Sequence, residues 1–214
     1  MKVGIVGSGS VAQAVGHGFL ERGDEVKLGS RSPEKLAEWI EKAGGKAGAG
    51  SFAEAAEFGE LLVLACKGTE TESAIEVAGK DNFADKVLMD ITNPLVVEEG
   101  PMPRLAYGPT DSGGEVVPRA LPETKVVKTL NIVNSGQMID PEVPKGERPP
   151  TMFVAGDDEG AKETVTGILG DFGWEDVIDI GGIDAARELE ALCVLWCRYA
   201  IPNQSWQAAF RVLR

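Results

Sequence analysis

The sequence predicts an α/β fold: a doubly wound, mostly parallel sheet with a small C-terminal α/β extension that ends in an apolar helix. Short apolar runs alternate with helical segments along the chain, which is typical of parallel sheets covered on both faces. A glycine-rich turn follows the first apolar run and opens a helix. Residues 184–201 are apolar over much of the circumference of a helix, so this last segment must be buried.

The elements follow in order from these patterns. We expect strands at residues 3–6, 25–28, 61–66, 86–90, 125–130, 151–155 and 176–180, with a short one within 44–50. Helices are expected at residues 10–21, 34–43, 52–58, 70–77, 115–121, 158–172 and 184–201. Ser51 is expected to cap the third helix. Residues 95–114 form the largest irregular stretch, which indicates a lid or binding segment, or an insertion.

The turn after the first strand has the pattern of a dinucleotide site. Gly7 allows a sharp turn, Gly9 lets a pyrophosphate approach the backbone, and Ala12 packs the helix against the strand. The N–H groups and dipole of the helix then face the phosphates. A purely structural tight turn is the alternative, but the strand–turn–helix–strand context favours a nucleotide.

The end of the second strand selects the nucleotide. An NAD site would have an acidic residue here to bind the ribose 2′-hydroxyl, but this chain has Gly29-Ser30-Arg31-Ser32. Arg31 and Lys35 are cations suited to a 2′-phosphate, and Ser30 and Ser32 supply further donors. We therefore predict NADP(H). In the alternative interpretation Arg31 is a solvated charge and Ser32-Pro33 is a plain helix start, with Ser32 as the cap and Pro33 at the first position.

Composition excludes several classes of function. A net charge of −13 argues against general binding to nucleic acid or anionic membranes. No apolar run reaches the length of a membrane span, and Met1-Lys2 leads directly into the first strand, so we expect no secretory leader. Three cysteines without a CxxC pair suit a reduced cytoplasm. A single histidine, His17, excludes a multi-histidine zinc site, and we predict no metal.

Ligands of open parallel sheets bind beyond the carboxyl ends of the strands, and this rule selects further residues. The expected cofactor contacts are Gly7, Ser8, Gly9, Ser10, Val11, Ser30, Arg31, Ser32, Lys35, Ala65, Cys66, Lys67, Asn93 and Pro94. Asn131 and Asn134 are expected to face a second ligand. At each position a cap or turn-forming role is the alternative.

Few side chains are suited to acid–base catalysis. His17 is expected about 10 Å along the first helix from its phosphate end, at about 1.5 Å per residue, so it is poorly placed. Lys67 and Tyr107 are the remaining candidate proton donors. Hydride transfer between two stacked rings needs no such donor, because positioning and exclusion of water supply most of the effect.

Several motifs together resemble the NADP oxidoreductases that use the deazaflavin coenzyme F420. These motifs are residues 2–12, Gly29-Ser30-Arg31-Ser32, Ile91-Thr92-Asn93-Pro94-Leu95, Lys128-Thr129-Leu130-Asn131 and Val154-Ala155-Gly156-Asp157-Asp158, with Glu190 in the last helix. The same domain is similar to the cytoplasmic reductase domain of the STEAP metalloreductases, which pass electrons from NADPH through flavin.

The resemblance implies a Rossmann fold and a homodimer, with residues 8–11 at the pyrophosphate. It further implies Ser30, Arg31 and Lys35 at the 2′-phosphate, and a deazaflavin against the nicotinamide near Asn131. The chain departs from the deazaflavin-dependent members at two places, since they carry His at the position of Asn131 and Pro near Lys67. The resemblance to the STEAP domain leaves a flavin open as the second cofactor.

These observations lead to one principal hypothesis. We expect a cytoplasmic NADP-dependent oxidoreductase that transfers hydride between NADPH and a deazaflavin or flavin ring. Residues 1–122 would bind NADP, and residues 123–214 would complete the sheet and the side that faces the second ligand. The rivals are a small imine or carbonyl reductase that uses Tyr107 or Lys67, and a non-catalytic NADPH sensor. The last helix packs on its own sheet or against a second subunit.

Overall fold

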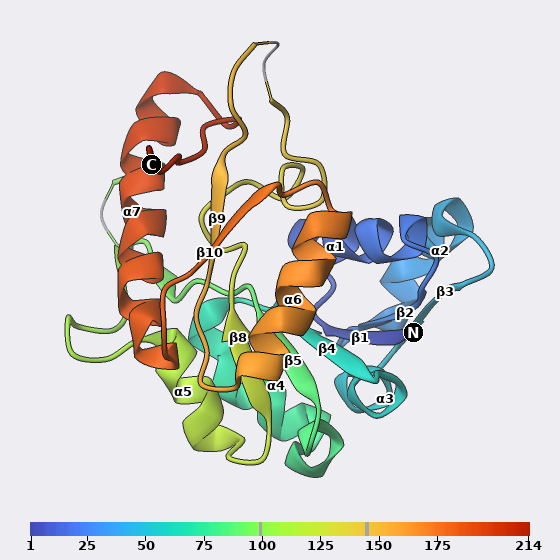
Figure 1. Ribbon diagram of the computed structural model, residues 1–214. Coiled ribbons are helices and arrows are strands. Elements are labelled where there is room, and N and C mark those ends of the chain that lie inside the picture. The colour runs from blue at the N-terminus through green and yellow to red at the C-terminus, as the bar shows by residue number, and fades with distance from the viewer. Residues whose placement is uncertain (99, 144–145) are drawn as a thin grey trace.

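The computed structural model describes residues 1–98, 100–143 and 146–214. Within these residues, six parallel strands form the central sheet in the order β3-β2-β1-β4-β5-β8 (Figure 1). Their bounds are β1 Lys2–Val6, β2 Glu25–Gly29, β3 Ala47–Gly50, β4 Leu61–Leu64, β5 Val87–Asp90 and β8 Lys125–Lys128. The chain runs outward from β1 to β3 and then returns to place β4 on the other side of β1. The predicted doubly wound fold is confirmed, and its crevice lies at this reversal.

Helices cover both faces of the sheet. Helices α1 (Ser10–Glu21), α2 (Ala37–Ala43) and α6 (Glu159–Asp171) pack on one face, and α3 (Phe52–Phe58), α4 (Thr71–Ala78) and α5 (Gly113–Ala120) pack on the other. Ile5 and Val63 face the first layer, whereas Val6 and Leu64 face the second. All four side chains are fully buried, which explains why β4 is apolar at every position and β1 carries no polar side chain after Lys2.

The C-terminal extension adds a second, small sheet. Strands β9 (Thr151–Val154) and β10 (Asp176–Asp179) pair in parallel, and an antiparallel bridge between Lys128 and Ala155 joins them to β8. Helix α7 (Ala186–Asn203) follows the 3₁₀ turn η4 (Ile183–Ala185) and lies beside this sheet (Figure 1). The C-terminal segment folds back on α7, where the Trp196 indole N–H donates to Ala208 O at 2.6 Å. The division of the chain at residue 122 stays a prediction.

Local sequence signals set most helix starts. Ser51 caps α3 as expected, and Glu54 completes a capping box with it. Ser32 makes no side-chain cap, so that part of the helix-start interpretation is wrong. Pro33 opens the 3₁₀ helix η1 (Pro33–Leu36) that precedes α2, as expected for the first helical position, and the Ser30 hydroxyl accepts the Ser32 N–H.

The stretch 95–114 is partly regular. Short strands β6 (Leu95–Val96) and β7 (Arg104–Leu105) form an antiparallel pair, and α5 begins at Gly113 rather than at the predicted Glu115. The earlier start has a cause, since the Ser112 side chain caps the helix by accepting the Glu115 N–H at 3.2 Å. Residue 99 lies outside the described residues, and the lid stays a prediction.

Helix α7 is only partly buried. Leu189, Cys193 and Trp196 are buried, whereas Leu195 is 57% exposed and Tyr199 is 56% exposed. The expected packing on its own sheet is not the main contact, because the buried face lies against α5, β7 and the C-terminal segment, and two large apolar side chains remain on the other face. No helix in the described part of the chain is both long and apolar enough to cross a membrane.

Candidate functional site

A cleft of about 440 Å³ lies at the carboxyl ends of β1, β2 and β4. The fold brings together ten of the predicted cofactor residues in its walls: Gly7, Ser8, Gly9, Ser30, Arg31, Ser32, Lys35, Ala65, Cys66 and Lys67. The three strands are neighbours in the sheet, so residues far apart in the sequence meet at one edge. This is the edge where open parallel sheets bind ligands.

The glycine turn shapes the floor of the cleft. Gly7 has φ of +152°, and a Cβ there would lie 2.4 Å from Ala65 O, so only glycine fits between β1 and β4. A Cβ on Gly9 would meet open space, so the backbone at Gly9 is accessible to a ligand. Gly9 is the N-cap of α1, which has no side-chain cap and no acidic residue in its first turn. The first N–H groups of α1 are therefore suited to an anion.

The end of β2 supplies the cations. Arg31 and Lys35 line the cleft, and the Arg31 guanidinium lies 3.8 Å from the Glu70 carboxylate on the opposite wall. The Arg31 side chain is 78% exposed and that of Glu70 is 48% exposed, so this ion pair is weak and easily opened. Ser30 is buried, and its hydroxyl accepts the Ser32 N–H at 3.0 Å.

The end of β4 supplies Cys66 and Lys67. Burial raises the pKa of the Cys66 thiol to about 11, although a hydrogen bond with Thr71 partly opposes the shift. Cys66 is therefore a neutral thiol near pH 7 and not a nucleophile. Lys67 is exposed and forms the start of η2 (Gly68–Glu70), which places its cation at the rim of the cleft.

One wall of the cleft was not predicted from the sequence. Its members are Phe52 on α3 and Glu70, Ser73, Ala74 and Val77 on η2 and α4. The spacing of residues 70, 73, 74 and 77 on a helix that follows a predicted strand was the available signal. Val77 lines the cleft and is 61% exposed, so this wall offers an apolar side chain to a ligand.

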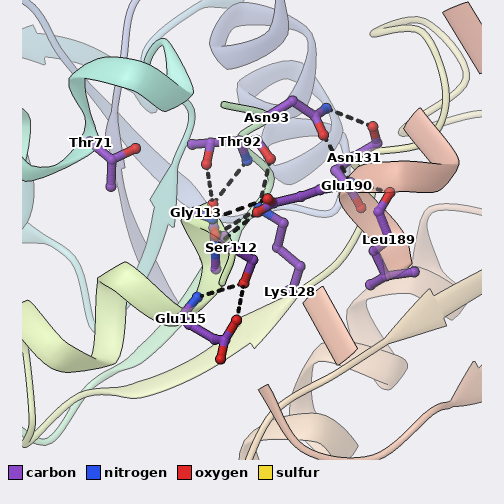
Figure 2. Close-up of polar contacts among 12 residues, drawn as sticks. Thr71, Thr92, Asn93, Ser112, Gly113, Glu115, Lys128, Asn131, Leu189 and Glu190 are labelled. Carbon is purple, nitrogen blue, oxygen red and sulfur yellow. Dashed lines mark hydrogen bonds and ion pairs between the residues drawn. The ribbon is translucent and has the colours of Figure 1, made fainter. Parts of the chain in front are cut away.

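The two asparagines at the ends of β5 and β8 form a reciprocal pair (Figure 2). Asn131 Nδ2 donates to Asn93 Oδ1 at 3.0 Å, and Asn93 Nδ2 donates to Asn131 O at 2.7 Å. Asn131 Nδ2 also donates to Leu189 O on α7 at 3.0 Å. Asn131 Oδ1 is buried and has no hydrogen-bond partner in the described structure. An unpartnered buried acceptor is unusual and is typical of a functional site.

The backbone beside this pair is unusual as well. Leu130 is fully buried and has φ of +57°, a conformation that costs a non-glycine residue on the order of 1–3 kcal/mol. Pro94, next to Asn93, packs closely on the β4 side, because a Cβ on Gly68 would lie 2.5 Å from Pro94 N. The Asn93–Asn131 pair therefore borders the β4 wall of the cleft from the β5 side.

Asn134 has different surroundings. Its Nδ2 donates to Gln137 Oε1 at 3.0 Å and to Trp206 O, and its Oδ1 accepts the Gly136 N–H at 2.8 Å. These contacts form a turn and hold the C-terminal segment. Its assignment to a second ligand stays a prediction. The cofactor assignments of Ser10, Val11, Asn93 and Pro94 also stay predictions, because these four are not among the described residues that line the cleft.

A buried ionic cluster lies behind the asparagine pair. The Lys128 ammonium lies 2.9 Å from Asp90 Oδ2 and 3.1 Å from Glu190 Oε1, and it donates to Thr92 O at 2.7 Å (Figure 2). All three charged side chains are at most 1% exposed. Burial opposes the charge of Lys128, but the carboxylates outweigh it and raise the pKa of Lys128 above its ordinary value. Glu190 also accepts the N–H groups of Gly113 and Gly114 at 3.0 and 2.9 Å.

The other candidate acid is Tyr107. It is partly buried in the segment before α5, and burial together with nearby Glu72 and Asp111 raises the pKa of its phenol. Tyr107 is thus a neutral O–H donor near pH 7. His17 packs against Trp39, with ring centroids 5.5 Å apart, and does not line the cleft in the described structure.

Comparisons with known proteins identify similar chains. The family model described as NADP oxidoreductase, coenzyme F420-dependent, matches residues 2–94. The F420-dependent NADP reductase of Methanocaldococcus jannaschii is 28% identical over 223 residues, which cover 99% of this chain and 98% of that protein. A crystal structure from Arthrobacter sp. FB24, provisionally assigned as an F420-dependent NADP-reductase, is 36% identical over 100% of both chains, with a TM-score of 0.94. The metalloreductase STEAP3 of Rattus norvegicus is 29% identical over 89% of this chain, which spans only 36% of that protein.

Proposed function

The chain belongs to the family of coenzyme F420-dependent NADP oxidoreductases, and on this premise we propose that it transfers hydride between NADP(H) and the deazaflavin ring of F420. The observation that carries the proposal is the arrangement of two sites along one edge of the sheet. The β2 and β1 ends offer cations and free backbone N–H groups. The β5 and β8 ends offer a buried acceptor without a donor.

We assign the first site to the adenosine and phosphate half of NADP. Gly7 to Val11 at the start of α1 would bind the pyrophosphate, where the open space at Gly9 lets it reach the backbone. Arg31 and Lys35, with Ser30 and Ser32, would bind the 2′-phosphate through charge-assisted hydrogen bonds. The apolar surface of Ala74 and Val77 suits the face of an adenine, and Lys67 at the rim suits a phosphate.

The second site receives the reacting rings in this proposal. A dinucleotide that starts at β2 and crosses β1 and β4 ends near β5, beside Asn93 and Pro94. Asn131 and Asn134 would then face the second ring. The residues fit such a ligand, because Asn131 Oδ1 lacks a donor and leaving it so costs about 1–3 kcal/mol. The carboxamide N–H of the nicotinamide would satisfy it, with the second ring stacked on the nicotinamide beside Asn131 and Asn134.

The two bound rings supply the redox chemistry: one hydride moves from NADPH to the oxidised deazaflavin, which also takes up a proton, to give NADP⁺ and reduced deazaflavin. The protein's residues bind and orient. Cys66 is a neutral thiol and Tyr107 a neutral phenol, and neither is needed to move a proton in the hydride step. Catalysis in this proposal rests on positioning and on exclusion of water.

Anaerobic NADPH oxidation, followed by nicotinamide absorbance, tests the acceptor. F420, FMN, FAD and riboflavin are offered separately. We expect turnover with F420. Turnover only with flavins would make the chain a flavin reductase, an outcome to which the Asn131 departure from deazaflavin-dependent members points. No turnover with any ring would contradict ring-to-ring transfer.

One observation favours a second candidate. Tyr107 is a neutral phenol, and its neighbour Ala106 donates its N–H to Pro94 O just beyond β5, so a small imine or carbonyl reductase with Tyr107 as proton donor is the alternative. Tyr107→Phe would then abolish turnover with a cyclic imine or ketone. A non-catalytic NADPH sensor would bind NADPH tightly and oxidise it with no acceptor.

We also propose that the protein is a cytoplasmic homodimer. The three cysteines are free thiols, which suits a reducing compartment. Leu195 and Tyr199 on α7, with Trp206 beyond it, form an exposed apolar surface that suits a second subunit.

A further inference from the structure

Lys128 and Glu190 take part in a closed ring of contacts that the hydride-transfer proposal does not use. Lys128 donates to Thr92 O at 2.7 Å, and Thr92 leads into Asn93. Asn93 accepts from Asn131 Nδ2 at 3.0 Å, and the same Nδ2 donates to Leu189 O at 3.0 Å. Leu189 leads into Glu190, whose Oε1 lies 3.1 Å from Lys128 Nζ. The ring joins the ends of β5 and β8 to α7 (Figure 2).

The ring fixes the orientation of the Asn131 amide. Both hydrogen bonds of its side chain within the ring come from Nδ2, so Oδ1 is left as the free acceptor. A rotated amide would place Oδ1 against Leu189 O and Asn93 Oδ1, which are both acceptors. The contacts that hold Thr92 and Leu189 in place therefore determine which atom of Asn131 is left without a hydrogen-bond partner.

Buried charged side chains hold this ring of contacts in place. Asp90 Oδ2 lies 2.9 Å from Lys128, and Asp90 Oδ1 accepts both the N–H and the hydroxyl of Thr92 at 2.9 and 2.7 Å. The N–H groups of Gly113 and Gly114 bind Glu190. A hydrogen-bonded network that is this deeply buried is rigid, because breaking a contact leaves a buried polar or charged group without its partner.

We infer that Lys128 and Glu190 are positioning residues: they act through Thr92 and Leu189 to hold the Asn93–Asn131 pair, with Asn131 Oδ1 free, for the nicotinamide end of the cofactor. The inference rests on the proposed function, in which the nicotinamide reaches the β5 end. Neither residue touches the cofactor in this arrangement. A loosely held pair would bind the ring half of NADP poorly and leave the phosphate half unaffected.

The test compares two ligands by titration calorimetry. NADP⁺ spans both sites, whereas 2′,5′-ADP carries the adenosine and the 2′-phosphate but no nicotinamide. For Glu190→Gln and Lys128→Met we expect NADP⁺ affinity to fall by roughly fivefold or more, with 2′,5′-ADP affinity within about twofold of the wild type. Equal losses for both ligands, or no loss in a folded variant, would overturn the inference.

Lys162→Met is the matched control. Lys162 on α6 is also a buried lysine between two carboxylates, 2.8 Å from Glu159 and 2.7 Å from Asp179. Its removal should lower stability without changing the ratio of the two affinities. If Lys128→Met fails to fold, Glu190→Gln and the near-isosteric Thr92→Val, which removes only the hydroxyl bond to Asp90, decide the question.

A second measurement needs no ligand. The side-chain NH₂ signals of Asn93 and Asn131 in a ¹⁵N-correlated spectrum report the pair directly. We expect both to shift in Glu190→Gln and to remain in place in Lys162→Met; unshifted signals in Glu190→Gln would refute the positioning role. These readouts do not depend on turnover. A wild type that is inactive with F420 and every flavin would refute the proposed function, while the spectra would still test the closed ring of contacts around Asn93 and Asn131.

Discussion

Arg31 is the single residue on which the preference for NADP depends most. It lies at the β2 end with its side chain 78% exposed, and its one ion pair among the described residues is the long contact to Glu70. A 2′-phosphate would displace that contact and gain a charge-assisted pair. Arg31→Ser should weaken NADPH binding about tenfold or more and leave NADH binding within about twofold, because NADH lacks the phosphate.

Fluorescence titration of both reduced nucleotides measures this ratio. Arg198→Ala, which removes one exposed arginine from α7, is the control for the change in net charge. An unchanged NADPH to NADH affinity ratio in Arg31→Ser would show that Arg31 is only a solvated charge.

The place of residues that directly follow a strand could be predicted from the sequence. Side-chain contacts between elements that lie far apart in the sequence could not. Gly7, Gly9 and Arg31 follow strands directly, so local pattern and the carboxyl-end rule placed them together. The Lys128–Asp90–Glu190 cluster joins three elements, and each residue alone has the pattern of an ordinary charge on a strand end or helix. Only the β5–β8 pairing and the docking of α7 bring them together.

At the scale of elements, the docking of α5 on α7 depends on a pair of glycines. A Cβ on Gly114 would lie 2.4 Å from the Ala186 Cβ, and Gly114 N–H binds Glu190. Gly114→Ala should therefore destabilise the protein by about 1–3 kcal/mol through overpacking. Denaturant unfolding measures the change.

The control is a glycine with free space around it. Gly167 lies inside α6, and a Cβ there would meet nothing within 4 Å. Gly167→Ala should stabilise the protein by about 0.5–1 kcal/mol, because alanine favours helix. If Gly114→Ala had the same effect as Gly167→Ala, the close packing of α5 on α7 would be contradicted.

The ion pair between Glu115 on α5 and Arg187 on α7 predicts that the stability of the protein depends on pH. Hydrogen bonds from the Arg187 guanidinium lower the pKa of Glu115 below its ordinary 4.5, although burial partly opposes this. Because the folded-state pKa is depressed, the stabilisation is fully present above about pH 4.5 and is lost as the pH falls through the folded value.

Glu115→Gln should thus lower the melting temperature at pH 7 and differ less from the wild type near pH 3. Glu163→Gln, at an exposed position of α6, should leave the melting temperature unchanged at both values. An equal loss at pH 7 and pH 3 in Glu115→Gln would show that the charge of Glu115 does not contribute.

Helix signals explain which element boundaries were predictable. Helix α1 was expected at residues 10–21 and spans Ser10–Glu21, because its turn and apolar spacing are both local. The start of α5 was missed by two residues, since glycines at positions 113 and 114 are poor helix formers and their place depends on Glu190 from α7. The β6–β7 pair has two residues a strand and no local signature.

At the scale of the whole molecule, the exposed face of α7 predicts self-association. Leu195 and Tyr199 lie one turn apart on that face. Light scattering should give twice the mass of the 22.6 kDa chain, and Leu195→Glu should yield the monomer. Leu213→Glu, which changes a 75% exposed leucine in the C-terminal segment, should leave the dimer intact. A monomeric wild type would contradict the homodimer.

The overall architecture was predictable because the central strands are buried on both faces. Such strands appear in the sequence as short apolar runs that alternate with helical segments. The way the C-terminal extension docks was not predictable, because its contacts depend on pairs such as Lys128 with Ala155 that no local pattern encodes. The described residues that line the nucleotide cleft all lie between Gly7 and Val77, whereas the asparagine pair depends on contacts with α7, which is why the nucleotide half of the site was easier to predict than its ring half.

Deuterium transfer tests the central claim most directly. NADPH stereospecifically deuterated at nicotinamide C4 is mixed anaerobically with the protein and oxidised F420, and the reduced deazaflavin is analysed by mass spectrometry. Direct hydride transfer between the two rings predicts deuterium from one C4 position on the deazaflavin in a single turnover. Oxidation without deuterium on the acceptor from either C4 position, or no oxidation at all, would contradict it.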